Sequence, residues 1–301
     1  MDEAALRTGL RQAGYLADEA LLTTQWLALE LQRPLLLEGD AGVGKTALAQ
    51  ALATACGRRL IRLQCVEGLD LNQAAYEWNY ARQLLAIRLQ ETGANRVDAS
   101  LAEAQLFGRD YLLERPLLAA LSSEQPAVLL IDEIDRADEA FEAFLLELLA
   151  DWQLSIPELG TVAARHVPWV LLTSNGTREL SDALRRRCLY HWLDYPTPER
   201  EVDIVRARLP QAEAQLVQQA VALVQALRRE DLKKAPGIAE SLDWVHALHR
   251  LGLRSLPDTG QALQHTLACL LKTREDRFQV DAQALDRLLQ PAQRGVAVPR
   301  S

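Results

Sequence analysis

Five short apolar runs recur along the first two thirds of the chain, and each is too brief to form a helix. They cover Leu35 to Leu37, Leu60 to Leu63, Val128 to Ile131, Val170 to Thr173 and Leu189 to Leu193. Short runs that are apolar on both faces are typical of strands buried inside a parallel sheet. Segments with helical spacing separate them, such as 18–31 and 45–55. This alternation predicts an α/β fold with a five-stranded parallel sheet covered on both faces.

The pattern changes after Asp194, where Tyr195-Pro-Thr-Pro predicts a turn. Helical spacing, without a convincing strand, then recurs near 199–208, 211–229, 238–251 and 260–271. We therefore expect an α/β domain over residues 1–196 and an all-α domain over 197–290. Residues 291–301 contain two prolines and no periodicity, so we expect a flexible tail.

Two segments interrupt the alternation inside the first domain. The stretch 66–125 separates the second and third predicted strands and is long enough to be an insertion. Segment 152–162 has a Pro-Glu-Leu-Gly centre between arms of alternating apolar residues, which predicts a β-hairpin.

Charge and composition disfavour nucleic acid as the main partner. The chain has 33 Lys and Arg against 41 Asp and Glu, a net charge of −8. A field of this sign repels polyanions. Aromatic residues, at 5%, also offer few surfaces on which unpaired bases could stack.

The apolar runs also argue against a membrane protein, because a spanning helix needs roughly 20 apolar residues. The N-terminal Met1-Asp-Glu-Ala is acidic and lacks the basic and apolar regions of a secretory signal. We expect a cytoplasmic protein without a membrane span. The four cysteines lack metal-ligand spacing, and we expect them to be core thiols.

A glycine-rich run follows the first predicted strand directly. It matches GxxxxGK(S/T) and lies between a predicted strand and a predicted helix, as this phosphate-binding motif requires. Backbone N–H groups and the helix dipole can cradle phosphates. Lys45 can reach the β- and γ-phosphates, and the Thr46 hydroxyl can hold Mg²⁺. The predicted nucleotide-binding residues are Gly39, Asp40, Ala41, Gly42, Val43, Gly44, Lys45 and Thr46.

The third predicted strand ends in two carboxylates, Asp132 and Glu133. The carboxyl ends of parallel strands share one edge of a sheet, so Asp132 is expected where the first strand delivers its loop. We expect Asp132 to bind Mg²⁺ together with Thr46, and Glu133 to polarise the attacking water. The alternative is an acidic first turn of the next helix, which is the role we expect for Asp135 and Asp138.

Two further candidates follow the fourth predicted strand. Asn175 ends that strand; alone it would be a turn residue, but beside the two earlier motifs a contact with the γ-phosphate or the attacking water is favoured. Arg185, Arg186 and Arg187 precede the fifth strand. Such a cluster is either a solvated helix end or the source of a guanidinium for a neighbouring subunit's ATP.

In this order, GDAGVGKT, VLLIDEID, TSN and RRRC resemble the motifs of AAA+ ATPases. The Arg-Cys pair is similar to the arginine finger of clamp loaders, which points to Arg187. RPLLLEGDAGVGKT, LLIDEIDRADEAFEAFLLELLADWQLSIPELGT and TSNGTRELSDALRRRCLYHWLDYP most resemble the MoxR group. EGLDLNQAAYEWNYARQLLAI and YLLERPLLAAL resemble its CoxD-like branch, which acts in carbon monoxide dehydrogenase maturation.

The resemblance implies a P-loop NTPase core with ATP and Mg²⁺, a helix-two insertion within 66–125 and a C-terminal helical lid. It also implies a hexameric ring, a pore-facing hairpin at 152–162 and a partner with a von Willebrand factor A domain. One departure is Ala239-Glu240, which stands where lids of this group carry a sensor arginine. Glu240 would repel phosphate, so we expect it to face away from the site.

The function predicted from this resemblance is an ATP-hydrolysing chaperone that matures a client metalloenzyme, such as molybdenum-copper carbon monoxide dehydrogenase. One alternative is a nucleic-acid motor, which the acidity disfavours; another is a nucleotide-gated assembly scaffold. Tyr76, Trp78 and Tyr80 could grip a protein client, although packing within the insertion is favoured. Trp152 and Leu154 of the hairpin are further candidates for client contact.

Overall fold

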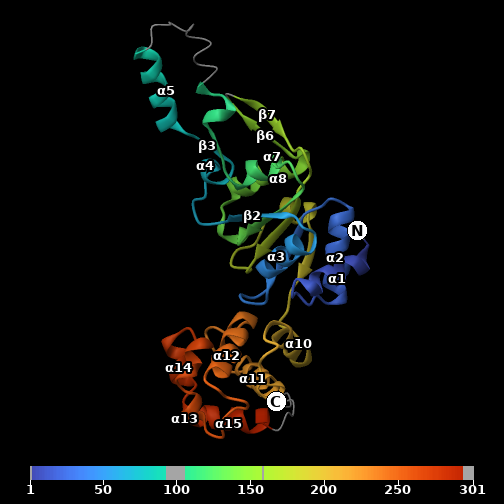
Figure 1. The fold of residues 1–301 in the computed structure, drawn as a ribbon, viewed down its shortest axis with the longest axis vertical. Helices are drawn as coiled ribbons and strands as arrows, with labels where there is room; N and C mark the ends of the chain where they lie inside the picture. The colour runs from blue at the N-terminus through green and yellow to red at the C-terminus, as the bar shows by residue number, and fades with distance from the viewer. Residues whose placement is uncertain (1, 93–105, 158, 294–301) are drawn as a thin grey trace. The chain divides into compact units, whose positions relative to one another are not determined.

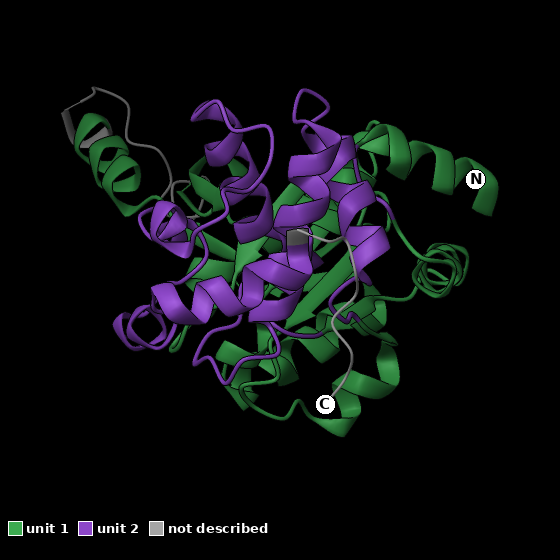
Figure 2. Ribbon diagram, turned by 90° about the horizontal axis from the view of Figure 1, so that it is seen from below, with its two compact units in different colours: residues 1–13, 17–38, 46–192 green, residues 14–16, 39–45, 193–301 purple. Residues whose placement is uncertain are grey.

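The computed structural model describes residues 2–92, 106–157 and 159–293. These residues form two compact units, which are coloured separately in Figure 2. Unit 1 comprises the described residues within 1–13, 17–38 and 46–192, and unit 2 comprises those within 14–16, 39–45 and 193–301. Within the described residues, no helix is both long and apolar enough to cross a membrane.

Unit 1 is built on a five-stranded parallel sheet, as the sequence predicts. Its strands are β1 (Leu35–Glu38), β2 (Arg59–Gln64), β5 (Ala127–Asp132), β8 (Trp169–Ser174) and β9 (Leu189–Trp192). Their order across the sheet is β2-β5-β8-β1-β9. All residues of β1 and β5 are buried, which explains why these runs are apolar on both faces. The carboxyl ends of β5 and β2 lie side by side, with Gln64 in register with Asp132.

Helices surround this sheet, and acidic or hydroxyl side chains begin several of them. The helices outside the insertion are α1 (Glu3–Gln12), α2 (Glu19–Glu30), α3 (Lys45–Ala55), α8 (Glu139–Asp151) and α9 (Asp182–Arg187). Asp138 accepts a hydrogen bond from the Phe141 N–H at 2.8 Å and so caps α8. The helix-start role predicted for Asp138 is therefore confirmed.

Segment 66–125 contains a small antiparallel sheet with short helices. Its elements are α4 (Leu71–Ala74), β3 (Tyr76–Trp78), α5 (Tyr80–Thr92), η1 (Arg109–Tyr111), β4 (Leu112–Glu114) and α7 (Pro116–Ser122). Helix α7 packs against β2 and β5, whereas α5 projects away from the sheet (Figure 1). The predicted packing of aromatic residues is confirmed for Trp78, which is buried and contacts Phe107 edge to face at 5.3 Å. Tyr80, by contrast, is 62% exposed.

Strands β6 (Gln153–Ile156) and β7 (Gly160–Ala163) form an antiparallel hairpin after α8. Leu154, Ile156 and Val162 are buried in the core of unit 1. The suggestion that Leu154 touches a client is therefore wrong, because its side chain serves packing. Trp152 is partly buried and ends α8 in a left-handed conformation, with φ 52° and ψ 42°.

The C-terminal part of unit 2 is helical, as the sequence predicts. It contains α10 (Pro198–Arg208), α11 (Ala214–Leu227), α12 (Ile238–Arg250), α13 (Gly260–Leu263), η3 (Thr266–Cys269), α14 (Arg274–Gln279) and α15 (Ala282–Gln293). Its core includes Trp244 and Leu289. Helix α15 continues through Pro291 to Gln293, so the first residues of the expected tail are helical. Leu289 and Ala292 are buried, and this packing holds the last turn despite the proline. Residues 294–301 lie outside the described part.

Candidate nucleotide site

The predicted phosphate loop, residues 39–45, has a backbone that only glycine permits at its key positions. Gly42 has φ 81°, in the left-handed region. A Cβ atom at Gly39 would lie 2.2 Å from the Leu193 carbonyl oxygen. Lys45 is buried, and its Nζ donates to the carbonyl oxygens of Gly39 at 2.6 Å and Asp40 at 2.7 Å. The lysine therefore closes the loop on itself and holds its ammonium group among phosphate-loop backbone atoms.

Asp132, the last residue of β5, collects hydroxyl and guanidinium donors. The Thr46 Oγ1 lies 3.1 and 3.2 Å from its two carboxylate oxygens. The Thr173 hydroxyl and the Arg62 guanidinium also donate to it, the latter at 2.5 Å. Asp132 is buried, but the Arg62 side chain is 52% exposed. The Thr46 hydroxyl and the Asp132 carboxylate are hard oxygen ligands of the kind that Mg²⁺ prefers.

Glu133 has a left-handed backbone, with φ 56° and ψ 52°. This conformation costs a residue with a side chain roughly 1 kcal/mol, and such strain concentrates at functional sites. The Glu133 N–H donates to the Thr173 hydroxyl at 2.9 Å. Its Oε2 accepts from Gln64 Nε2 at 3.0 Å and from Arg136 Nε at 3.0 Å.

Arg62 and Gln64 also belong to this site, and neither was predicted from the sequence. Both lie on β2, two residues apart, and both reach the carboxylates that end β5. The available signal was the polar residues that alternate with buried ones in β2, where Ile61 and Leu63 are buried. That alternation shows that Arg62 and Gln64 share one face of the strand, but it does not show which strand lies beside β2.

Asn175 directly follows β8, and its backbone is held by Asp135. The Asn175 N–H donates to Asp135 Oδ2 at 3.2 Å. The Thr177 N–H and hydroxyl donate to the same oxygen at 3.0 and 2.6 Å. Burial alone would raise the pKa of the Asp135 carboxyl, but hydrogen bonds from Thr177 and Asn175 outweigh it and lower that pKa.

Asp135 does lie in the first turn of a helix, but this is a separate short 3-10 helix and not α8, and its side chain bonds the loop after β8. Residues Ile134–Arg136 form a short 3-10 turn, and α8 begins only at Glu139. The Asp135 side chain does not cap α8; it accepts hydrogen bonds from Thr177 in the loop after β8. Asp135 and Asp138 therefore have different roles: the buried Asp135 binds a loop, whereas the exposed Asp138 caps α8.

The three arginines of α9 differ in their surroundings. Arg185 Nη2 lies 3.9 Å from Oε1 of the buried Glu38. The backbone carbonyls of Arg186 and Arg187 accept from Arg33, at 2.5 and 3.1 Å, which satisfies the helix end. The Arg187 side chain is exposed, and no described residue pairs with its guanidinium.

In unit 2, α12 begins against the phosphate loop. The Ile238 N–H donates to the Gly42 carbonyl at 2.9 Å. Glu240 Oε2 accepts from the Gly237 N–H at 3.0 Å and lies 3.4 Å from a Cβ built on Gly42. The prediction that Glu240 faces away from the site is therefore wrong. The bond from the Gly237 N–H, one half of a capping box, draws this carboxylate back toward Gly237, which itself packs on Gly42.

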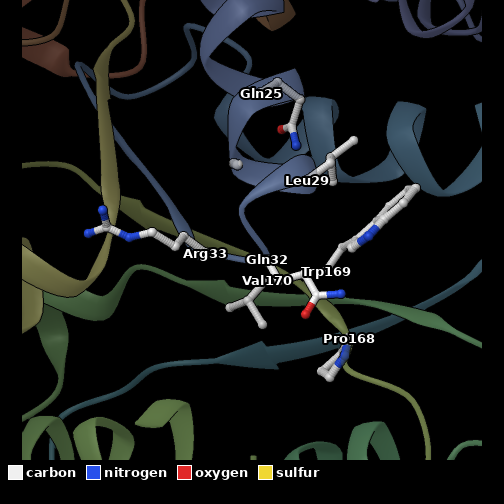
Figure 3. Close-up of a pocket in the computed structure, with 8 residues that line it drawn as sticks. Gln25, Leu29, Gln32, Arg33, Pro168, Trp169 and Val170 are labelled. Carbon is white, nitrogen blue, oxygen red and sulfur yellow. The ribbon is translucent and has the colours of Figure 1, made fainter. Parts of the chain in front are cut away.

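A cavity in unit 1 lies away from these residues, beside the segments that enter β1 and β8. Its lining includes Gln25, Leu29, Arg33, Pro168 and Trp169 (Figure 3). Its volume is about 10 Å³, which is close to the minimum for one water molecule. This cavity is too small for a nucleotide.

Residues 34–188, just over half of the chain, match the AAA domain (dynein-related subfamily). A stretch of 93 residues is 42% identical to midasin of Giardia intestinalis, over 31% of this chain and 2% of midasin. Gas vesicle ATPase GvpN of Haloferax mediterranei is 28% identical over 66% of this chain and 58% of that protein. The chain thus spans less than two thirds of either relative.

Two more comparisons cover most of the chain. An uncharacterized protein of Staphylococcus saprophyticus is 22% identical over 83% of this chain and 89% of its own length. The structure of a mutant RuvB protein of Thermotoga maritima matches with a TM-score of 0.52 at 18% identity. That match covers 96% of this chain and 85% of RuvB. At this identity it shows a shared fold.

Proposed function

Because the chain belongs to the AAA domain family (dynein-related subfamily), we propose that it hydrolyses ATP to ADP and phosphate. The observation that carries the proposal is the contact of Thr46 Oγ1 with both oxygens of Asp132, at 3.1 and 3.2 Å. This contact joins the residue after the lysine of the phosphate motif to the carboxylate that ends β5. It is the arrangement expected when both motifs serve one nucleotide.

The residues of the phosphate loop would bind the nucleotide. Backbone N–H groups of residues 39–45 would face the phosphate oxygens, as in other glycine-rich loops. The Lys45 ammonium, which bonds the Gly39 and Asp40 carbonyls, would exchange them for β- and γ-phosphate oxygens. Thr46 and Asp132 would hold Mg²⁺, which neutralises charge that develops on the phosphates.

Glu133 and Asn175 would act on the attacking water. The Glu133 carboxylate would accept a hydrogen bond from the water and polarise its oxygen toward the γ-phosphorus. Asn175 would orient the same water or the γ-phosphate through its side-chain amide. The Arg187 guanidinium, exposed at the end of α9, would complete the site of a neighbouring subunit in a hexameric ring.

For the wider role, we infer a MoxR-type chaperone that matures a client metalloenzyme with a von Willebrand factor A domain partner. Molybdenum-copper carbon monoxide dehydrogenase is the client that the CoxD-like motifs suggest. The motifs at Glu67–Ile87 and Tyr111–Leu121 support this inference, and they fall in the insertion that carries β3, α5 and β4. The likeness to GvpN, a gas vesicle ATPase, favours a second candidate role, that of an ATPase connected with gas vesicles.

Two alternatives have less support. RuvB shares the fold, but at 18% identity it carries no argument for action on nucleic acid, which the net charge of −8 also disfavours. A nucleotide-gated scaffold would not need a hydrolytic carboxylate. The presence of Lys45, Asp132, Glu133 and Asn175 together favours turnover.

Phosphate release by the purified full chain with ATP and Mg²⁺ tests the proposed hydrolysis. We expect turnover by the wild type and none by Glu133→Gln, which should still bind ATP because the amide preserves shape. A wild type without turnover would contradict the proposal. For the client, the Glu133→Gln chain should retain a metalloenzyme and a von Willebrand factor A domain protein from its native host only with ATP. Retention of gas vesicle proteins instead would favour the second role.

A further inference from the structure

Two buried carboxylates hold the segment that runs from Asn175 to Arg187. Asp135 and Glu142 are 3% and 1% exposed, and both follow Asp132 within ten residues of sequence. Each accepts hydrogen bonds from residues that follow β8. Hydrogen bonds at two points thus connect the stretch after Glu133 to the stretch from Asn175 to Arg187.

Asp135 holds the first part of that segment. Its Oδ2 receives three donors, which are the N–H groups of Asn175 and Thr177 and the Thr177 hydroxyl. Because Asp135 is only two residues from Glu133, these bonds fix the Asn175 backbone relative to Glu133. Asn175 and Glu133 must address the same water in the proposed mechanism, so their separation matters.

Glu142 holds the second part, at the start of α9. Its Oε1 accepts from the Arg178 guanidinium, and its Oε2 accepts from the Ser181 N–H at 3.0 Å. Arg178 also donates to the Ala137 carbonyl at 2.7 Å. Ser181 is the N-cap of α9, the helix that ends in Arg187. Glu142 therefore fixes the base of the element that presents the proposed arginine finger.

We propose that Asp135 and Glu142 are positioning residues with different targets. Asp135 sets Asn175 for the ATP site of its own subunit, and Glu142 sets Arg187 for the ATP site of the neighbouring subunit. This proposal rests on the proposed ATP hydrolysis and on the ring arrangement. Asp135 and Glu142 thus serve the ATP sites of two different subunits, although they lie only seven residues apart in the sequence.

Amide hydrogen exchange on the full chain without nucleotide tests the contacts independently of turnover. Asp135→Asn should lower protection at Asn175 and Thr177, and Glu142→Gln should lower it at Ser181. Thr177→Val, which removes only the hydroxyl donor, should reproduce the Asp135→Asn effect in part. Asp138→Asn and Glu147→Gln are the matched controls, because Asp138 only caps α8 and Glu147 is exposed on the same helix. Both controls should leave these amides unchanged.

Turnover then separates the two targets. Asp135→Asn and Glu142→Gln should each lower kcat on the order of 100-fold, the loss that a misplacement of about 1 Å can cause. ATP affinity should change by less than about threefold, because neither residue contacts the phosphates. Mixing with Glu133→Gln subunits should restore partial turnover for Glu142→Gln, whose own site is intact and receives Arg187 from its neighbour. Mixing should not restore Asp135→Asn, since neither subunit then has a working site.

The mixture of Arg187→Ala with Glu133→Gln subunits is the positive control for exchange of fingers. Suppose that the wild type hydrolyses ATP but the Asp135→Asn and Glu142→Gln variants keep normal kcat or normal amide protection. That result would overturn this inference and leave the proposed ATP hydrolysis intact. Recovery of Asp135→Asn but not Glu142→Gln would overturn the assigned targets. A wild type that releases no phosphate would overturn the proposed function and this inference with it.

Discussion

The carboxylate of Glu133 accepts a hydrogen bond from the side-chain amide of Gln64, with 3.0 Å between Oε2 and Nε2. Gln64 ends β2 and lies in register with Asp132, the residue before Glu133. The proposed water-polarising group is thus held by the neighbouring strand as well as by Arg136. Both bonds go to Oε2 and draw on the carboxylate charge with which Glu133 would polarise the attacking water.

Gln64→Leu should therefore raise the basal kcat. A hydrogen bond with a net contribution of about 1 kcal/mol corresponds to about fivefold in rate. Steady-state phosphate release at saturating ATP and Mg²⁺ measures the effect, and KM for ATP should stay the same. Gln50→Leu, an exposed glutamine on α3, is the control. A fall in kcat on replacing Gln64 would show instead that this residue orients Glu133 for catalysis.

Lys45→Ala should weaken ATP binding by about 100-fold or more. The ammonium group is buried among loop carbonyls, so its loss removes charge-assisted bonds worth about 1.5–3 kcal/mol each to phosphate. Calorimetric titration with ATP and Mg²⁺ gives the affinity. Near-ultraviolet circular dichroism checks that the variant keeps its tertiary structure, because Lys45 also bonds Gly39 and Asp40. An unchanged affinity for ATP in a folded variant would contradict the assignment of residues 39–45 as a phosphate-binding loop.

Much of the fold follows from local pattern. The strand from Leu35 to Glu38 and the strand from Ala127 to Asp132 are apolar on both faces, because both are buried on both faces. In a parallel sheet their carboxyl ends share one edge, which is why Asp132 could be placed near the phosphate motif. The order of strands across the sheet is set by long-range packing, and no local pattern reports it.

Gln64, Asp135 and Glu142 owe their roles to such long-range packing, which no local pattern reports. Gln64 reaches Glu133 only because β2 pairs with β5. Asp135 and Glu142 have ordinary places in an acidic stretch, and only burial against the segment after β8 separates them from Asp138. Glu240 is different, since a glutamate at the third position of a helix can accept from the N-cap N–H, as it does from Gly237, and that spacing is visible in the sequence.

Glu240→Gln should tighten ATP binding by about fivefold. The amide can still accept from the Gly237 N–H, so the cap remains, but the negative charge beside Gly42 is gone. A charge a few ångströms from phosphate is worth about 1 kcal/mol in a water-like medium, and this energy sets the expected change. Fluorescence titration with a labelled ATP analogue measures it, with the exposed Glu213→Gln as control. Weaker binding by Glu240→Gln would show that the carboxylate helps to hold the nucleotide.

Acid should destabilise the C-terminal part of unit 2 through Asp276. Burial alone would raise the pKa of this carboxyl, but hydrogen bonds from Thr273, Lys233 and Lys234 outweigh it and lower that pKa. Because the native pKa is lowered, the ionised carboxylate stabilises the folded state at any pH above the usual Asp pKa of about 3.9. This contribution to folding stability is lost as the pH falls through the native pKa. Exchange at the Lys233 and Lys234 amides should accelerate over that range.

The matching variant is Asp276→Asn, which should be less stable at neutral pH and should lose less stability on acidification. Asp281→Asn, an exposed helix cap in the same region, is the control and should keep the wild-type dependence. Thermal unfolding from neutral pH down to about pH 2, well below the usual Asp value, distinguishes them. Equal pH dependence of Asp276→Asn and the wild type would contradict the assignment.

Arg187→Ala should bind ATP normally yet lose turnover by about 10³-fold or more, the usual effect of removing an arginine finger. Its guanidinium is exposed and meets no described partner, so it is available to a neighbouring subunit. Arg185 is the contrasting neighbour, because it lies 3.9 Å from the buried Glu38. Arg185→Ala should therefore lower the melting temperature by leaving that carboxylate without its cation, an effect that Arg187→Ala should not have.

Arg186→Ala is the closest control, since Arg186 is also exposed on the last turn of α9. Single-residue substitutions of all three arginines, measured for ATP affinity, kcat and melting temperature, assign each one. Only Arg187→Ala should combine normal affinity, normal melting and lost turnover, and only its turnover should recover when Glu133→Gln subunits are added. If Arg186→Ala shows that combination instead, the finger is one residue earlier in the helix. Because neighbouring residues on a helix point about 100° apart, that result would also require a different approach of the adjacent subunit.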